Sequence, residues 1–221
     1  MTLALLHTSP VHVPVYDALR DAHEPGLALR HLVHEDLLAR ARAEGPGAVA
    51  DDIRALLAAA VADGAGVVVC TCSTISGVAE EQAAAVGVPV LRGDRPMAAR
   101  AVAAGERVTV IATVASTLGP SAALVAEEAA RAGRTVAVRT VLVDGAWERF
   151  EAGDREGYLD LVAAAVDAVT DADVIVLAQP SLADAADRVR TPLPVLSSPR
   201  TGFEAGAAAC GRLKNAYGEG S

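Results

Sequence analysis

The segment 67–77, VVVCTCSTISG, combines an apolar run with two cysteines and several hydroxyl side chains. β-Branched apolar residues followed at once by small polar ones are typical of a buried parallel strand whose carboxyl end opens into a pocket. The following segment, 77–85, has a helix-forming composition, which sets the cysteines between a strand end and a helix amino terminus. This arrangement predicts a reactive loop.

Cys72 is the candidate acid/base or nucleophile of this loop. Backbone N–H groups and the positive dipole end at a helix amino terminus favour anions, and they would lower the pKa of the Cys72 thiol below its free value of about 8.5. A small buried apolar role is the competing interpretation for Cys72. It is the preferred one for Cys70, which continues the strand.

Length and charge bound the class of protein. The 221 residues, 52% of them hydrophobic, can bury one large core or two cores of roughly 100 residues each, which excludes a disordered chain. The net charge of −9 disfavours a nucleic-acid or anionic-membrane partner, since both require clustered Lys and Arg. A small anionic substrate stays possible, because hydroxyls and backbone N–H groups can bind a carboxylate in an acidic protein.

The cysteine count and the amino terminus indicate the compartment. Three cysteines, Cys70, Cys72 and Cys210, form no disulfide framework and suit a reducing cytosol. The first apolar run stops at Leu6, and charge interrupts the later ones before about 18 residues, so neither a signal peptide nor a membrane span is expected. We expect a cytoplasmic protein with no membrane or nucleic-acid partner. The sequence is compatible with a homo-oligomer.

Strand and helix patterns alternate along the whole chain, which predicts an α/β fold with parallel sheets. Strands are expected at residues 3–6, 27–33, 67–70, 89–91, 108–112, 135–143, 174–177 and 195–197. Helices are expected at 51–62, 77–85, 95–104, 121–131 and 155–169 and at the carboxyl terminus. His7, at the end of the first strand, could carry a proton or bind a ligand, although a hydrogen-bonded wall residue is the commoner role.

The pattern repeats internally. Aligning GVVVCTCSTISG with DVIVLAQPSLAD sets Val67 against Val174, an offset of 107, and two other strand pairs align at an offset of 105. The repeat predicts two pseudo-symmetric halves, 1–105 and 106–221, the first of which the terminal helix could complete. Ligands of open α/β sheets bind outside the carboxyl ends of the strands, so the halves would enclose one pocket, with Cys72 facing Gln179.

Hydroxyl-rich loops follow several of these strands. Each such residue alone is more often a cap or a turn residue, but together they would supply donors to a carboxylate whose charge grows during reaction. The candidate substrate-binding residues are Thr8, Ser73, Thr74, Thr113, Ser116, Thr117, Gln179 and Ser181. Further possible contacts, for which surface ion pairs and packing are the alternative roles, are Arg95, Arg200 and Trp147.

Other classes of site lack their signatures. No G-x-G-x-x-G follows a strand, no P-loop is present, and no second Cys or His pair completes a metal site around Cys70 and Cys72. A cysteine phosphatase needs an arginine six positions after its nucleophile, where this chain has Val78.

The ordered motifs resemble the aspartate/glutamate racemase superfamily, which includes glutamate, aspartate and hydantoin racemases, maleate isomerase and arylmalonate decarboxylase. The resemblance spans nearly the whole chain and is carried by VVVCTCSTISG, RPMAARAV, VTVIATVASTL, DVIVLAQPSLA and PVLSSPRTG. It implies two pseudo-symmetric halves, no organic cofactor or metal, and cysteines acting in a cleft between the halves. In the racemases, one cysteine from each half exchanges the substrate's α-proton.

This chain departs from that pattern in its second half. The first cysteine of the family maps onto Cys72, or onto Thr71 if the alignment shifts by one residue, but the matching second loop carries Gln179. Glutamine cannot exchange a proton as a thiol does, and Cys210 on the final helix is too distant along the chain to replace it. The decarboxylase branch also works with one cysteine, but carries it in the second half.

The resemblance and the residues together predict a cofactor-independent racemase- or isomerase-type enzyme that acts on a small carboxylate through Cys72. One alternative is a decarboxylase of a malonate-type acid on the same fold. The other is a two-lobed binding or regulatory protein that binds a small carboxylate without turnover, an interpretation that Gln179 favours.

Overall fold

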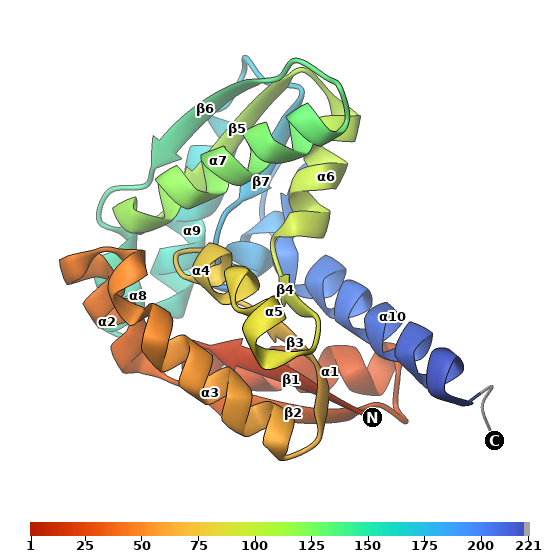
Figure 1. Cartoon of the computed structure of the whole chain (residues 1–221). Helices are drawn as coiled ribbons and strands as arrows, with labels where there is room; N and C mark the ends of the chain where they lie inside the picture. Colours follow the sequence, from red (N-terminus) through yellow and green to blue (C-terminus); the bar gives the residue numbers. More distant parts are fainter. Residues whose placement is uncertain (219–221) are drawn as a thin grey trace. The chain divides into compact units, whose positions relative to one another are not determined.

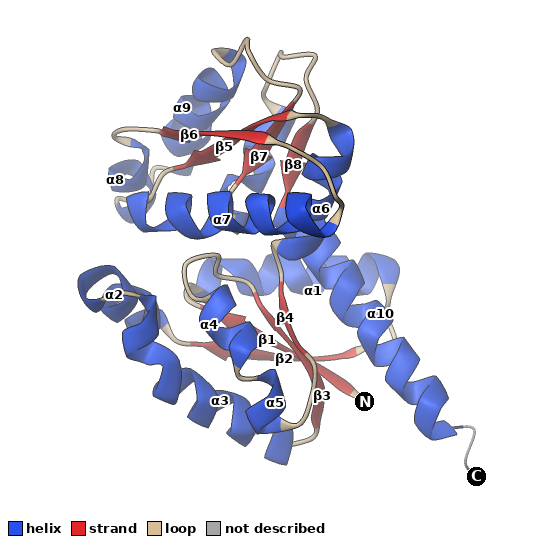
Figure 2. Ribbon diagram, turned by 45° about the horizontal axis from the view of Figure 1, so that its top comes forward, coloured by secondary structure: helices blue, strands red, loops and turns tan. Residues whose placement is uncertain are grey.

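The computed structural model describes residues 1–218 and divides the chain into two compact units (Figure 1). The first unit comprises Met1–Gly93 and the chain from Pro199 onward, and the second comprises Asp94–Ser198. Each contains one four-stranded parallel sheet with helices packed on it (Figure 2). Within residues 1–218, no helix combines the length and the apolar character needed to cross a bilayer.

The sheet of the first unit has the strand order β2-β1-β3-β4. Its strands are β1 (Thr2–His7), β2 (Ala28–Val33), β3 (Ala65–Cys70) and β4 (Val90–Arg92). Its helices are α1 (Val13–His23), α2 (Glu35–Glu44), α3 (Ala50–Ala62), α4 (Ser76–Glu81), α5 (Ala83–Val86) and α10 (Ser198–Gly218), with short 3-10 turns η1 (Pro10–His12) and η2 (Pro46–Val49).

Alternate residues of the central strands pack on opposite faces of this sheet, as the pleat of a strand requires. Leu6 and Val68 belong to a core shared with α2 and α3, whereas Leu5 and Val67 belong to one shared with Tyr16 of α1 and with α10. Both faces are therefore covered, and this explains why β1 and β3 are apolar throughout rather than alternating.

The second unit repeats this plan with the strand order β6-β5-β7-β8. Its strands are β5 (Arg107–Ala112), β6 (Ala137–Leu142), β7 (Val174–Leu177) and β8 (Val195–Ser197). Its helices are α6 (Arg95–Ala104), α7 (Ala115–Arg131), α8 (Ala146–Glu151) and α9 (Arg155–Asp167), and the 3-10 segment η3 (Pro180–Asp187) follows β7. Helices α6 and α7 cover one face, and α8 and α9 cover the other.

The strand register reproduces the internal repeat. Leu3 pairs with Val67 in the first sheet, and Val108 pairs with Val174 in the second. These four residues are related by the same offsets of 105 and 107 that the sequence alignment gives. The predicted α/β fold with two parallel-sheet halves is confirmed.

Several element boundaries differ from the sequence prediction. Helix α6, which falls within the predicted half 1–105, packs in the second unit. Helix α7 begins at Ala115 rather than at residue 121, because Pro120 is accommodated inside the helix instead of preceding it. The expected helix 77–85 is two short helices that meet at Gln82. Helices α1, α2 and α8 were not predicted.

Helix α10 packs closely on the rest of the first unit through two glycines. A Cβ atom on Gly202 would lie 2.4 Å from the carbonyl oxygen of Gly93, and one on Gly206 would lie 2.8 Å from Cγ2 of Val69. A methyl group cannot occupy either space without displacing its neighbour. The glycines thus allow Phe203 and Cys210, both buried, to reach the core on this face.

This packing makes Gly202→Ala destabilising. Since the clash is with backbone, we expect the free energy of unfolding to fall by about 2 kcal/mol in urea titration. Gly211→Ala is the matched control, because nothing lies within 4 Å of a Cβ there on the same helix, and it should be neutral or stabilising by up to about 1 kcal/mol. Equal effects of the two variants would contradict this account.

Candidate functional site

Cys72 lies in the turn that follows β3, and its side chain is half-buried at the edge of a core. Its carbonyl oxygen accepts hydrogen bonds from the backbone N–H groups of Ile75 and Ser76, at 3.1 and 2.9 Å. These bonds close the turn between the strand and α4. Cys70 is buried in the strand, as predicted, and none of the three cysteines forms a disulfide.

Thr71, the residue before Cys72, is held by three contacts to two neighbouring residues. The N–H and the hydroxyl Oγ1 of Thr71 lie 3.0 and 3.1 Å from the carbonyl oxygen of Leu6, and Oγ1 lies 2.8 Å from Nδ1 of His7. Nε2 of His7 lies 2.9 Å from Nδ1 of His31, and Nε2 of His31 lies 3.3 Å from a carboxylate oxygen of Asp17. His7 is thus a hydrogen-bonded wall residue, the commoner of its two expected roles.

The histidines near this turn are poorly solvated. Burial, followed by the nearby His12 and His31, lowers the pKa of His7 from 6.5 to about 3. Burial also lowers the pKa of His12 to about 4. His7 is therefore a neutral imidazole at neutral pH, with one N–H donor and one acceptor nitrogen. In residues 1–218, no group of three or more His, Cys, Asp or Glu side chains is arranged to hold a metal ion.

In the second unit, Gln179 stands at the end of β7 and bonds to the end of β5. Its Oε1 accepts from the N–H of Thr113 at 2.7 Å and from the Thr113 hydroxyl at 3.0 Å. Because a backbone N–H can only donate, these bonds fix which end of the amide faces Thr113. The Nε2 donors point away from it and form no hydrogen bond within the described part of the chain.

Tyr158 of α9 joins this cluster without having been predicted. Its hydroxyl lies 2.8 Å from Oγ of Ser181 and 3.5 Å from Oγ1 of Thr113, and burial raises its pKa. Ser181 is thereby linked to Thr113 through a side chain from a distant helix. In the sequence, Tyr158 is one large residue on an amphipathic helix, and nothing local distinguishes it from a core residue.

Ser116 and Thr117 lie in the first turn of α7 and not in the loop where the sequence placed them. Thr117 is buried, and its N–H donates to the carbonyl oxygen of Val114 at 3.0 Å. The hydroxyl oxygen of Ser116 is buried without a hydrogen-bond partner among the described residues. It is an available donor at the positive end of a 17-residue helix.

The remaining candidates, Thr8, Ser73 and Thr74, are buried at the carboxyl ends of β1 and β3. By the repeat offsets, Thr8 and Cys72 occupy the positions that Thr113 and Gln179 occupy in the second unit. The structure therefore gathers the predicted residues at the strand ends of each sheet. It brings Thr113 and Gln179 into contact and links Ser181 to them.

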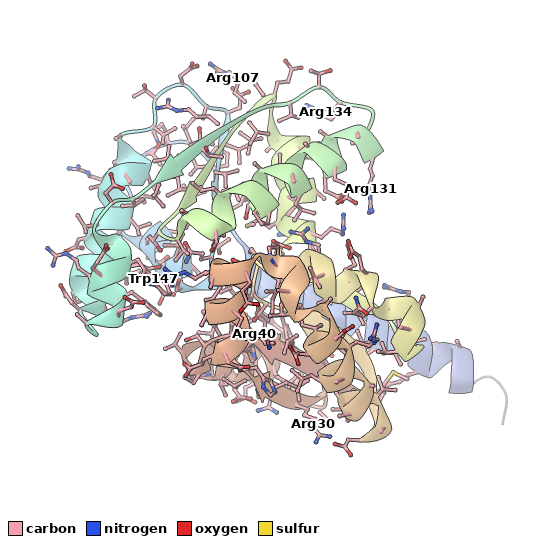
Figure 3. The ribbon with its side chains drawn as sticks, turned by 60° about the vertical axis from the view of Figure 1, so that its left-hand side comes forward. Arg30, Arg40, Arg107, Arg131, Arg134 and Trp147 are labelled. Atoms are coloured by element: carbon pink, nitrogen blue, oxygen red, sulfur yellow. The ribbon has the colours of Figure 1, made fainter. Side chains whose placement is uncertain are left out.

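The three further contacts considered in the sequence, Arg95, Arg200 and Trp147, have structural roles. Arg95 pairs with Glu128 at 2.5 Å, and Arg200 pairs with Glu204 at 2.8 Å. Trp147, labelled in Figure 3, lies on α8. Its indole N–H donates to Glu151, and its ring stacks on that of Phe150. Ion pairing and packing, the alternative roles, account for these residues.

The low pKa of His7 makes folding pH-dependent. Between about pH 6.5 and pH 3 the unfolded chain binds a proton at this position that the native chain does not, so stability falls as pH falls, by up to about 1.4 kcal/mol per pH unit. We expect His7→Asn to flatten the decline in urea-unfolding free energy between about pH 6.5 and pH 5. The exposed His23→Asn should keep the wild-type slope, and an unchanged slope in His7→Asn would contradict the assignment.

Comparison with solved structures shows that other proteins have a similar fold. Solved structures similar to the chain include glutamate racemase from Aquifex pyrophilus (TM-score 0.66, 15% identity, 94% of this chain and 83% of that one). Glutamate racemase from Francisella tularensis, in complex with D-glutamate, is another (0.71, 12%, 96% and 82%). Arylmalonate decarboxylase is a third (0.59, 20%, 95% and 92%).

A search of curated protein sequences gave no match. The model of the Asp/Glu/Hydantoin racemase family matches residues 3–206, which include every strand-end loop described above. The chain therefore belongs to the Asp/Glu/Hydantoin racemase family.

Proposed function

We propose that this protein is a racemase- or isomerase-type enzyme that acts on a small carboxylate without a cofactor, with Cys72 as acid/base or nucleophile. The observation that carries the proposal is a half-buried thiol in the turn after β3, in a chain that belongs to this family. The turn is closed by backbone bonds to the Cys72 carbonyl, which favours a fixed direction for the side chain. A fixed direction matters because proton transfer requires hydrogen-bond reach.

Removing a proton beside a carboxylate builds negative charge on its oxygens, and this charge requires aimed donors. The second unit offers donors of the required kind: the Nε2 group of Gln179, the hydroxyl of Ser116 and the first N–H groups of α7. Gln179 is pre-oriented by its two hydrogen bonds to Thr113, so its side chain would lose little conformational entropy when a carboxylate binds. We assign these groups to carboxylate binding, together with Thr8, Ser73, Thr74 and Thr117.

The presence of Gln179 at the position equivalent to Cys72 limits the types of reaction that the site can support. Racemisation by two thiols needs an acid/base on both faces of the substrate carbon, and an amide cannot serve as one. A single thiol can add to an activated double bond during isomerisation, or it can deliver a proton to one face only. One-face protonation is also what a decarboxylase needs after CO2 leaves, so the lone loop cysteine favours a malonate-type decarboxylase as the second candidate.

The reaction can be tested with a panel of α-amino, α-hydroxy, unsaturated and malonate-type acids in heavy water. Deuterium incorporation, double-bond isomerisation and CO2 release are measured separately. We expect turnover of at least one acid, and a loss of at least about 100-fold in kcat for Cys72→Ala. Cys70→Ala, which removes a buried thiol two residues away, should keep kcat.

Full activity in Cys72→Ala would refute the assignment of the thiol. Binding of a carboxylate by calorimetry, with no turnover of any acid in the panel, would instead support a binding protein that has lost catalysis.

The anion-binding role of α7 has its own test in Ser116→Ala. Loss of one donor to a charged group should raise KM, or the Kd of a bound carboxylate, by about tenfold. Ser121→Ala is a matched control, because its hydroxyl is also buried on α7 without a partner among the described residues. Both variants should unfold at or above the wild-type denaturant midpoint. Equal affinities of the two variants for the carboxylate would contradict the role of Ser116.

A further inference from the structure

A chain of four polar side chains connects the surface of the first unit with the residue before Cys72. It runs from Asp17 through His31 and His7 to Thr71, with successive distances of 3.3, 2.9 and 2.8 Å. The Asp17 side chain is 40% exposed, the His31 side chain 16%, and His7 is fully buried. The proposed function does not use this chain.

Two arrangements of protons satisfy every hydrogen bond of this chain. In the first, the Thr71 hydroxyl donates to Nδ1 of His7, Nε2–H of His7 donates to Nδ1 of His31, and Nε2–H of His31 donates to Asp17. Both imidazoles are neutral, and each nitrogen is used once as a donor or an acceptor.

A second arrangement contains one more proton and uses the same heavy-atom positions. His31 is doubly protonated and donates to Asp17 and to Nε2 of His7, which now carries its proton on Nδ1 and donates it to Thr71. The Thr71 hydroxyl is then free to donate to the carbonyl oxygen of Leu6, 3.1 Å away. Every donor again has an acceptor, so the added proton leaves no buried polar group unsatisfied.

We infer that Asp17, His31, His7 and Thr71 form one proton-sharing unit, in which proton uptake by His31 changes the tautomer of buried His7 and reverses the hydrogen bond at Thr71. His7 and His31 are then positioning residues for the turn that carries Cys72. That last role rests on the proposed function, whereas the tautomer change does not.

The surroundings of the chain decide where the extra proton resides. His7 is in ring contact with His12 of η1, Tyr16 of α1 and His31 of β2, at centroid distances of 6.2, 5.3 and 5.2 Å, and it forms no ion pair with a carboxylate of residues 1–218. His31 contacts the Asp17 carboxylate, which also pairs with Arg20 at 3.5 Å. Burial and the two neighbouring histidines disfavour a charged His7, so the charge stays at His31 beside Asp17.

The second unit shows that the fold does not require this chain. The bond from Thr71 N–H to the Leu6 carbonyl has its counterpart in the bond from Ala178 N–H to the Ile111 carbonyl, at 2.9 Å. At the positions equivalent to Thr71, His7 and His31, the second unit has Ala178, Ala112 and Thr140. The polar chain occurs only in the unit whose loop contains a cysteine.

Long-range 1H–15N correlation of 15N-histidine-labelled protein tests the inference without substrate. As the pH is lowered, we expect the proton of neutral His7 to move from Nε2 to Nδ1 when His31 gains its second proton, with one common midpoint. Asp17→Asn removes the carboxylate that accepts from His31 and should make the tautomer change harder to reach, and His31→Asn should abolish it. The exposed His23→Asn should leave both unchanged.

A His7 that keeps one tautomer when His31 gains its second proton, or changes it independently of His31, would overturn the inference. Thr71→Val removes both the donor and the acceptor at residue 71, so it should displace the midpoint of the tautomer change, and Thr71→Ser should restore it. If the acid panel gives turnover, the pH profile of kcat should move with the tautomer midpoint in Asp17→Asn. An inactive protein with the expected tautomer change would refute the proposed function and leave the proton-sharing unit intact.

Discussion

The candidate site depends on one backbone hydrogen bond at the end of each central strand pair. Thr71 N–H to the Leu6 carbonyl in the first sheet, and Ala178 N–H to the Ile111 carbonyl in the second, are the last links between these strands before the chain turns away. Parallel pairing spaces such bonds evenly, so the strand register determines where each loop leaves the sheet. Cys72 and Gln179 each follow the residue that donates this bond by one position. Their positions are therefore set by the strand register of the two sheets.

Upon this shared backbone the two units place different side chains. Around the Cys72 turn, the first unit joins a buried histidine, a partly buried histidine and a threonine in one hydrogen-bonded chain, while the second has alanine at two of the equivalent positions. The second unit instead fixes an amide through Thr113 and leaves donors on α7 and on Gln179. The repeat makes the backbones of the two units similar, whereas the polar side chains at the strand ends, where chemistry is proposed, differ between them.

The sequence predicts the fold class and all eight strands well, because apolar runs at strand positions and the repeat offsets agree with each other. It places Ser116 and Thr117 incorrectly, since Pro120 suggests a helix start that the structure does not have. It identifies His7 and Thr71 singly, but it cannot connect them to Asp17 and His31, because that connection depends on strand register and on an α1 helix with a single buried residue. Tyr158 was missed for a similar reason, as its partners come from other elements.

The close approach of Gly202 to Gly93 has a consequence for how the chain is made. Helix α10 completes the first unit, yet it lies after the entire second unit in the sequence. During synthesis, residues 94–198 are an uninterrupted stretch that contains its own sheet and both of its helical layers before α10 emerges. The sheet face formed by Leu3, Leu5, Val67 and Val69 must wait for α10, so the unit that is translated first is the one that finishes folding last.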